Sequence, residues 1–399
     1  MFWKRCIPLI AMACTAPPDQ ASFEEDPVGQ WLSGDLHVHS TGASNDTHGD
    51  SWPEAIAAHA RALGLFFVVL TDHSNSTGSD PTTTDEDPAL FNQGPEFVTR
   101  DAAAQWSEDE KFLMVSGNEI SPRAATDTPT GHVGCLPMEP ETLDIDTPFI
   151  DRPRGAVRGG DALQQALDRN CFAVINHPYS AAPWVAYDWS AYGYHGMEIF
   201  NGGGGGLDLF DLASRDAWRC DLLQGRQVTP VAASDNHRIH QEAPGTLLDP
   251  ALGWPGTSVF ATEPTWPAII EGLLAGKVSL HDGDSRLYLD SYDKRKARAT
   301  GHHILYLRLR GELDIHAQPA QLQLTRAHHC SDTRPDASQA PHVEESTLLS
   351  QEIQPGDSFD ITIEISPESG VYTAILLPGY PSRLEGVRYA ALSKAIPVP

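Results

Sequence analysis

Short apolar runs of strand length alternate with helix-like stretches along most of this chain, from about Trp31 to about Arg286. The apolar runs are Leu32–Val38, Leu65–Leu70, Phe112–Val115, Cys171–Ile175, Met197–Phe200 and Val228–Ala233. The helix-like stretches are Pro53–Leu63, Ala162–Leu167, Leu207–Leu223 and Trp266–Ala275, each followed closely by a Gly or Asn that suits a left-handed C-cap. Strands buried on both faces that alternate with helices predict a mainly parallel sheet, either closed into a barrel or open.

The character of the sequence changes after Leu280. Short β-type runs follow one another there, separated by turn residues, and two of them alternate between apolar and polar side chains: His303–Leu309, Leu322–Arg326, Phe359–Ile365 and Val371–Leu377. This pattern predicts a small all-β unit, sandwich-like and of roughly 100 residues. We therefore divide the 399 residues into a leader and tether at 1–30, an α/β domain at 31–285 and a β-rich accessory domain at 286–399.

The first residues of the chain resemble a signal peptide. Lys4 and Arg5 precede the apolar run Ile7–Ala13, which is much too short to span a bilayer. The run ends in Ala11-Met12-Ala13-Cys14, similar to a lipoprotein cleavage box in which Cys14 carries the lipid. We therefore predict that the protein is exported, either as a cell-envelope lipoprotein or by plain secretion. The third alternative is that the hydrophobic terminus is fortuitous. Any membrane contact would then go through the lipid anchor.

Charge and cysteine content exclude two classes of function. The formal net charge of −27 repels polyphosphate backbones, which argues against a long nucleic acid as ligand and leaves a small-molecule substrate. The four cysteines after the leader are widely spaced and form no C-x-x-C pair, so we expect buried thiols or one incidental disulfide rather than a zinc-thiolate site: Cys135, Cys171, Cys220 and Cys330. Nothing in the sequence indicates an oligomeric state.

Residues that can bind metals gather where the predicted strands end. His37 and His39 lie two apart at the end of the first run, so their side chains share one face. The later runs end in Thr71-Asp72-His73, Gly117-Asn118-Glu119, Asn176-His177-Pro178 and Ser234-Asp235-Asn236-His237. In parallel α/β folds, active sites are built at the carboxyl ends of the strands. The pattern therefore predicts a metal centre at that edge. His132 lies on a short apolar segment, and its spacing alone does not decide its role.

The order of these motifs resembles the PHP (polymerase and histidinol phosphatase) superfamily of metal-dependent hydrolases. Gly131-His132-Val133, Gly196–Asn201 and the trailing Gly272–Lys277 with Asp282-Gly283 are most similar to its CehA/McbA-type branch. The resemblance covers roughly residues 33 to 290. It implies a distorted (β/α)7 PHP-type barrel with two or three divalent metal ions at its C-terminal rim, and nothing about the β-rich tail.

The resemblance also implies a ligand set. One metal would take His37, His39, Glu119 and Asp235, a second Glu119, His132 and His177, and a third His73, His237 and a residue from the segment after His39. For that last ligand, counting forward from His39 favours Asp46, which we choose, whereas counting back from Pro53-Glu54 favours Asp50. Glu119 would bridge two ions, and Glu119 and Asp235 would be central to catalysis.

Mixed nitrogen and oxygen ligands suit Zn, Mn or Fe(II), and two neighbouring ions can generate a hydroxide nucleophile without a protein Ser or Cys. Asp72 and Asn236 are expected to orient ligand imidazoles. Arg123 and Arg238 follow ligands closely and could meet an anionic substrate, or could be solvated surface residues.

The ligand set predicts a hydrolase, and the resemblance implies phosphoester bonds, the commonest substrates of that family, in a small phosphate ester or nucleotide. Hydrolysis of a carbamate, amide or ester is the alternative, and a metal-binding surface lipoprotein is the alternative without enzymatic activity. The amidohydrolase barrel also begins with His-x-His, but it normally uses a bridging Lys where this chain has Glu119. We expect catalysis to belong to the α/β domain and the tail to serve packing or targeting.

Overall fold

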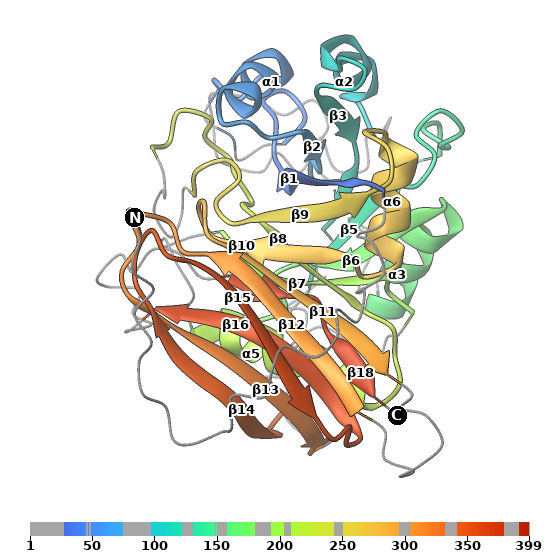
Figure 1. Cartoon of the computed structure of the whole chain (residues 1–399). Coiled ribbons are helices and arrows are strands. Elements are labelled where there is room, and N and C mark those ends of the chain that lie inside the picture. Colours follow the sequence, from blue (N-terminus) through green and yellow to red (C-terminus); the bar gives the residue numbers. More distant parts are fainter. Residues whose placement is uncertain are drawn as a thin grey trace.

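The computed structural model describes residues 28–398, except 45–46, 48, 75–96, 122–130, 148, 150–157, 180–192, 203–208, 243–249, 295–303, 332–340 and 379–390. Its architecture is mixed α/β (Figure 1). The described helices are α1 (Pro53–Ala62), α2 (Arg100–Trp106), α3 (Gly159–Asp168), α5 (Leu209–Leu223) and α6 (Trp266–Leu274). None of them is long and apolar enough to cross a membrane. The leader, including Cys14, lies outside the described residues.

Ten strands belong to the first part of the described chain. They are β1 (Gln30–Val38), β2 (Phe67–Leu70), β3 (Leu113–Ser116), β4 (Asn118–Ile120), β5 (Val133–Pro137), β6 (Cys171–Ile175), β7 (Gly196–Asn201), β8 (Thr229–Ala233), β9 (Gly256–Ala261) and β10 (Val278–His281). Strands β2, β6 and β8 are buried at every position, as continuous apolar runs require. The first helix buries Ile56, Ala57 and Ala60, begins at Pro53, and is followed by Gly64 with a φ of 75°.

Strand pairing leads from β1 around to β8. Strands β1, β2 and β3 pair in parallel, β4 continues β3 after Gly117, and β5 pairs antiparallel with both β4 and β6. Strands β6, β7 and β8 are parallel again. The end of β8 then meets the end of β1, where the His39 amide donates to the Asn236 carbonyl and the Asp235 amide to the His37 carbonyl, each at 2.9 Å. The ends of β1, β2, β6 and β8 thus share one edge, which we call the strand-end edge.

Antiparallel β5 explains the position of His132. This residue directly precedes β5, and because β5 runs against β6, its beginning lies beside the end of β6. His132 therefore reaches the strand-end edge from the start of a strand, whereas the other ligand histidines lie at or just after the ends of strands. Gly117 permits the bend between β3 and β4, since a Cβ there would lie 2.9 Å from the Cys135 carbonyl oxygen.

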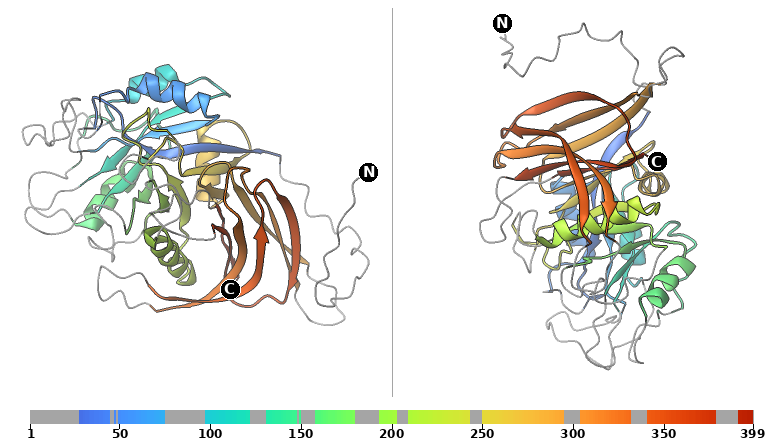
Figure 2. Two further views of the ribbon diagram at one scale, coloured as in Figure 1. Left: turned by 90° about the vertical axis from the view of Figure 1, so that its left-hand side faces the viewer. Right: turned by 90° about the horizontal axis from the view of Figure 1, so that it is seen from below.

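The elements described in the last part of the chain are all strands. They are β11 (Arg286–Lys294), β12 (Ile304–Glu312), β13 (Ala320–Cys330), β14 (Val343–Ile353), β15 (Ser358–Ile365), β16 (Gly370–Pro378), β17 (Ala391–Ser393) and β18 (Ile396–Val398). Strands β11, β12 and β15 form one sheet. Strands β14, β13, β16 and β17 join β10, so that the second sheet continues into β9, β1, β2 and β3. Both views of Figure 2 place these C-terminal strands beside α5. The pairing of β17 with β10 thus joins strands from both sides of the predicted domain boundary at 285/286. The boundary itself stays a prediction.

The cysteines differ from the sequence expectation. All four form disulfides, Cys135 with Cys171 and Cys220 with Cys330, so the expectation of buried thiols or one incidental bridge is wrong. The reason is topological: antiparallel pairing of β5 and β6 brings the first pair together across 36 residues, and packing of α5 on β13 brings the second together across 110.

Candidate metal centre

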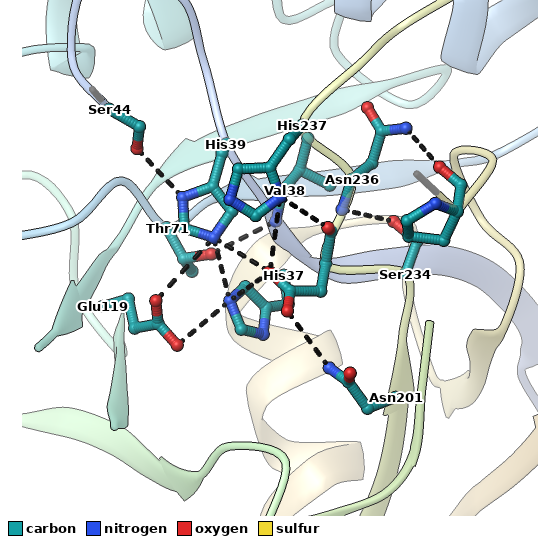
Figure 3. Close-up of polar contacts among 12 residues, drawn as sticks. His37, Val38, His39, Ser44, Thr71, Glu119, Asn201, Ser234, Asn236 and His237 are labelled. Carbon is teal, nitrogen blue, oxygen red and sulfur yellow. Dashed lines mark hydrogen bonds and ion pairs between the residues drawn. The ribbon is translucent and has the colours of Figure 1, made fainter. Parts of the chain in front are cut away.

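Eight of the nine predicted ligands meet at the strand-end edge. Figure 3 shows His37, His39, His237 and Glu119 pointing toward one another from the end of β1, from β4 and from the segment after β8. The full set is His37 in β1, His39 after β1, His73 after β2, Glu119 in β4, His132 before β5, His177 after β6, and Asp235 and His237 after β8. Asp46 lies outside the described residues.

Three of these side chains, His37, His39 and Asp235, form one group that could hold a metal ion. The Nε2 atoms of His37 and His39 are 3.1 Å apart and lie 3.2 and 3.0 Å from Asp235 Oδ1. The Glu119 carboxylate lies beside this group, with Oε1 3.3 Å from His37 Nε2 and Oε2 3.8 Å from His39 Nε2. Ligand atoms about 2.0–2.1 Å from a tetrahedral zinc ion lie about 3.3–3.4 Å from one another. The separations of 3.0–3.2 Å among His37, His39 and Asp235 are close to that value.

The other face of Glu119 carries a second group of imidazoles. Its Oε1 lies 3.0 Å from His132 Nδ1 and 3.1 Å from His177 Nε2, and its Oε2 lies 2.8 Å from His73 Nδ1. Despite that proximity, His132 Nδ1 is buried and makes no hydrogen bond in the described part of the chain. A nitrogen aimed at a carboxylate without hydrogen-bond geometry is suited to ligating a shared cation. This is the arrangement in which Glu119 can bridge two ions.

A third group combines His73 and His237 with His39. One ligand atom from each lies within 4.8 Å of the others, and the rings of His39 and His237 stack at 4.0 Å. The resemblance assigned His39 to the first metal only, so the structure differs by placing this ring between two groups. The alternative third ligand, Asp50, instead has its Oδ2 4.0 Å from His240 Nε2.

Electrostatics leave Glu119, Asp235 and His39 in the protonation states that ligation needs, whereas the surrounding carboxylates raise the pKa of His37 and His177. Burial raises the pKa of Glu119, but the imidazoles of His132 and His37 outweigh it and hold that pKa well below its ordinary value. Asp235 behaves in the same way, through His37 and neighbouring rings. Burial, with repulsion from His237, lowers the pKa of His39 to about 3. At neutral pH both carboxylates are ionised and His39 is neutral.

Asp72 orients His39 indirectly, through Ser44. The hydroxyl of Ser44 donates to Asp72 Oδ1 at 3.0 Å and lies 2.9 Å from His39 Nδ1, from which it accepts. The proton on Nδ1 leaves the Nε2 lone pair directed at the centre. Burial raises the pKa of Asp72 to about 6, against hydrogen bonds from Ser40 and Ser44.

The remaining predicted residues occupy different positions. Asn236 is fully buried, and its amide Nδ2 donates to the carbonyls of Arg238 and Pro250, so its side chain anchors a loop where we expected it to orient an imidazole. Only its main-chain carbonyl contacts a ligand residue, His39. The side chain of Arg238 is half-buried, and no described contact links it to the ligand atoms. Arg123 lies outside the described residues.

Other polar residues at the centre were not among the predicted site residues. Glu198 Oε1 accepts from His37 Nδ1, Asn176 Nδ2 donates to Glu119 Oε1 at 2.9 Å, and the Ser121 hydroxyl lies 2.7 Å from His73 Nδ1. The available signal for Glu198 was a single carboxylate inside the apolar run Met197–Phe200. A buried charge in a strand needs a partner, so such a residue marks a polar cluster.

Two ligand residues adopt strained backbone conformations. The φ angles of His177 and Asp235 are 28° and 56°, in the left-handed region that costs a residue with a side chain about 1–3 kcal/mol. Hydrogen bonds hold both peptides: the His177 amide donates to Glu198 Oε2 at 2.6 Å, and the Asp235 amide donates to the His37 carbonyl. The fold thus stores strain at the strand-end edge.

No protein-family model matches this chain, and no curated protein does. Among solved structures, it is similar to a two-domain protein containing a predicted PHP-like metal-dependent phosphoesterase from Bacteroides vulgatus, with 16% identity, 93% of this chain and 96% of that chain covered, and a TM-score of 0.42. It is also similar to Endonuclease Q in complex with a 27-mer duplex that carries an abasic lesion at the active site, with 14% identity and a TM-score of 0.38. That match covers 62% of this chain and 57% of the other.

Proposed function

We propose that this protein is a hydrolase that uses two or three divalent metal ions bound at the strand-end edge. One observation carries the proposal: eight side chains of metal-ligand type, from six different strands or strand ends, meet with pairwise separations of 2.8–3.8 Å between key ligand atoms. Separations of this size between buried donors suit shared cations. Zn, Mn and Fe(II) all remain candidates for these mixed ligands.

The strand order supports a catalytic domain of the PHP type. Counting β3 and β4 as one bent strand, the pairings run through seven strands from β1 to β8 and return to β1 at Val38 and Asn236. This is the order that a distorted (β/α)7 barrel requires. We propose that residues 31–285 form this barrel and that residues 286–399 form a sandwich-like accessory domain.

The chemistry follows from the ligand arrangement. Ions bound in such a pair activate water and polarise the oxygen of the group under attack. Glu119 and Asp235 would hold the two ions in place, and the imidazoles would complete their ligation. His73, His132, His237 and Asp235 are the members with side chains 12–22% exposed, whereas His37, His39 and Glu119 are at most 3% exposed. Substrate therefore approaches from the side of the exposed members. The described cysteines are all in disulfides and supply no nucleophile.

We propose a phosphoester as the bond that is cleaved, in a small phosphate ester or a nucleotide. A carbamate, amide or ester is the second candidate, and the net charge of −27 favours it, because an acidic protein repels an anionic substrate. Both bonds present an oxygen that a metal pair can polarise. The third candidate is a surface lipoprotein that binds metal and has no enzymatic activity.

Export is part of the proposal. The two disulfides support it, since disulfides persist in oxidising compartments and are rare in the cytosol. Cys14→Ser separates the forms of export: if Cys14 carries lipid, the variant leaves the membrane fraction, and unchanged fractionation excludes the lipid anchor.

A substrate panel tests the function. Metal-free protein is reloaded with Zn²⁺, Mn²⁺ or Fe²⁺ and assayed on p-nitrophenyl phosphate, bis-p-nitrophenyl phosphate and an aryl carbamate, with Asp235→Asn as the matched control. We expect metal-dependent release of p-nitrophenol from a phosphate ester. Turnover of the carbamate alone would move the assignment to the second candidate. Metal binding with no turnover on any of the three would favour the lipoprotein without enzymatic activity.

A further inference from the structure

Glu198 lies in the middle of β7 and is 1% exposed, and it contacts ligand residues of two different metal groups. Its Oε1 lies 3.2 Å from His37 Nδ1, on the side of that ring turned away from the centre. Its Oε2 accepts from the His177 amide at 2.6 Å. One carboxylate therefore joins a ligand of the first group to a ligand of the second.

Asn201, at the end of β7, extends this connection. Its Nδ2 donates to Glu198 Oε2 at 3.0 Å and lies 3.5 Å from Asp235 Oδ2. In Figure 3 the amide of Asn201 reaches toward the ligand cluster from the side opposite Glu119. The strand β7 contributes no ligand itself, yet through these two residues it contacts three residues that do.

Each contact has a distinct physical effect. The carboxylate fixes the proton of His37 on Nδ1, so that the Nε2 lone pair faces Asp235 and Glu119. At His177 it holds a peptide whose φ of 28° costs free energy, and that backbone conformation determines where the ring lies. Without the carboxylate, the Nδ1 proton of His37 would be buried unpaired and the His177 peptide could relax.

We propose that Glu198 is a positioning residue that couples the two metal sites: it orients His37 in one and His177 in the other, so that both sites lose affinity together when it is altered. The inference rests on the proposed function, since it requires that these side chains bind metal. Glu198 contacts neither ion nor substrate in this proposal and acts through the ligands alone.

The test is a competitive titration of the metal-free full-length chain with Zn²⁺ against a chelating dye, which yields the stepwise dissociation constants. In Glu198→Gln, one carboxylate oxygen becomes an NH₂ group, which donates and does not accept, so the side chain can no longer accept from both His37 and His177. We expect both constants to rise about 10–100-fold, the usual effect of losing a group that orients a ligand. The control is Asp221→Asn, which removes a buried carboxylate in α5 that is bonded to Tyr194 and Arg226. Its constants should equal those of the wild type.

The outcomes separate this inference from the function itself. If the wild type binds no Zn²⁺, the proposed function fails. If the wild type binds two ions and Glu198→Gln changes neither constant, or only one, the coupling is refuted and the function stands. If Glu198→Gln does not fold, Asn201→Ala removes only the neighbouring amide; a rise in the dissociation constants then supports the coupling, and unchanged constants overturn it.

Discussion

Buried polar groups distinguish the strand-end edge from the C-terminal strands. At the strand-end edge, His37, His39 and Glu119 are at most 2% exposed, they contact one another, and nearby backbone is strained. The core of the C-terminal strands is almost entirely apolar, built on residues such as Leu307 and Leu324. The first arrangement gives up stability to hold reactive groups in place, whereas the second contributes stability. Variants at the strand-end edge should therefore lose metal and activity, whereas variants in the core of the C-terminal strands should lose stability.

The largest effect is expected at Glu119. Glu119→Ala removes the carboxylate that contacts His37, His132 and His177, so more than one equivalent of metal should be lost. Turnover should fall by more than about 100-fold, because even groups that only orient ligands are worth about 10–100-fold. Elemental analysis and the substrate panel measure both. A variant that keeps its metal would show that Glu119 bridges nothing.

A core leucine of the C-terminal strands should affect stability and leave metal binding unchanged. Leu324 in β13 is fully buried, and Leu324→Ala should lower the free energy of unfolding by about 2–5 kcal/mol. Metal content and turnover of the folded protein should not change. Both are measured at a temperature well below the thermal unfolding transition of the variant. Loss of metal in folded Leu324→Ala would mean that the two regions are not separable.

The disulfide between α5 and β13 connects the regions. The double variant Cys220→Ala, Cys330→Ala should lose about 2–4 kcal/mol of stability, since the bridge closes a long loop in the unfolded chain. Chemical denaturation measures the loss, and metal content serves as the control. Unaltered stability would indicate that contacts such as Arg219 with Glu345 suffice to hold α5 on the sheet.

The smallest effect is expected at an exposed ion pair of the C-terminal strands. Arg308 donates to Asp360 and lowers its pKa, so this pair stabilises the fold above the ordinary carboxyl pKa and the contribution disappears as the pH falls below about 4. Asp360→Asn should lower stability by less than about 1 kcal/mol at neutral pH and by nothing at pH 2. Thermal melts at both values check this, and a difference that grows toward low pH would contradict it.

The sequence predicted most of the site because its signals are local. A polar residue at the end of an apolar run, as in Thr71-Asp72-His73, reveals both the strand and the edge at which the side chain emerges. The same logic placed His37, His177 and Asp235. The C-terminal alternation of β15 was visible for a similar reason, since side chains alternate along a strand.

Features that depend on distant pairing were not predictable. His132 reaches the metal centre because β5 runs antiparallel to β6, and no local sequence pattern encodes the direction of β5. The disulfide partners depend on which strands become neighbours. Glu198 was visible only as a charge inside an apolar strand, and its partners lie 161 and 21 residues away. Short strands such as β4 also carry too few residues for a clear period.

The central claim is that the strand-end edge holds more than one metal ion, and metal stoichiometry tests it most directly. Full-length protein purified without chelator is analysed by elemental mass spectrometry against its measured concentration. The account predicts at least two equivalents of transition metal per chain, because Glu119 contacts imidazoles of separate groups, His37 at 3.3 Å and His132 at 3.0 Å. A value of one equivalent or less would contradict it.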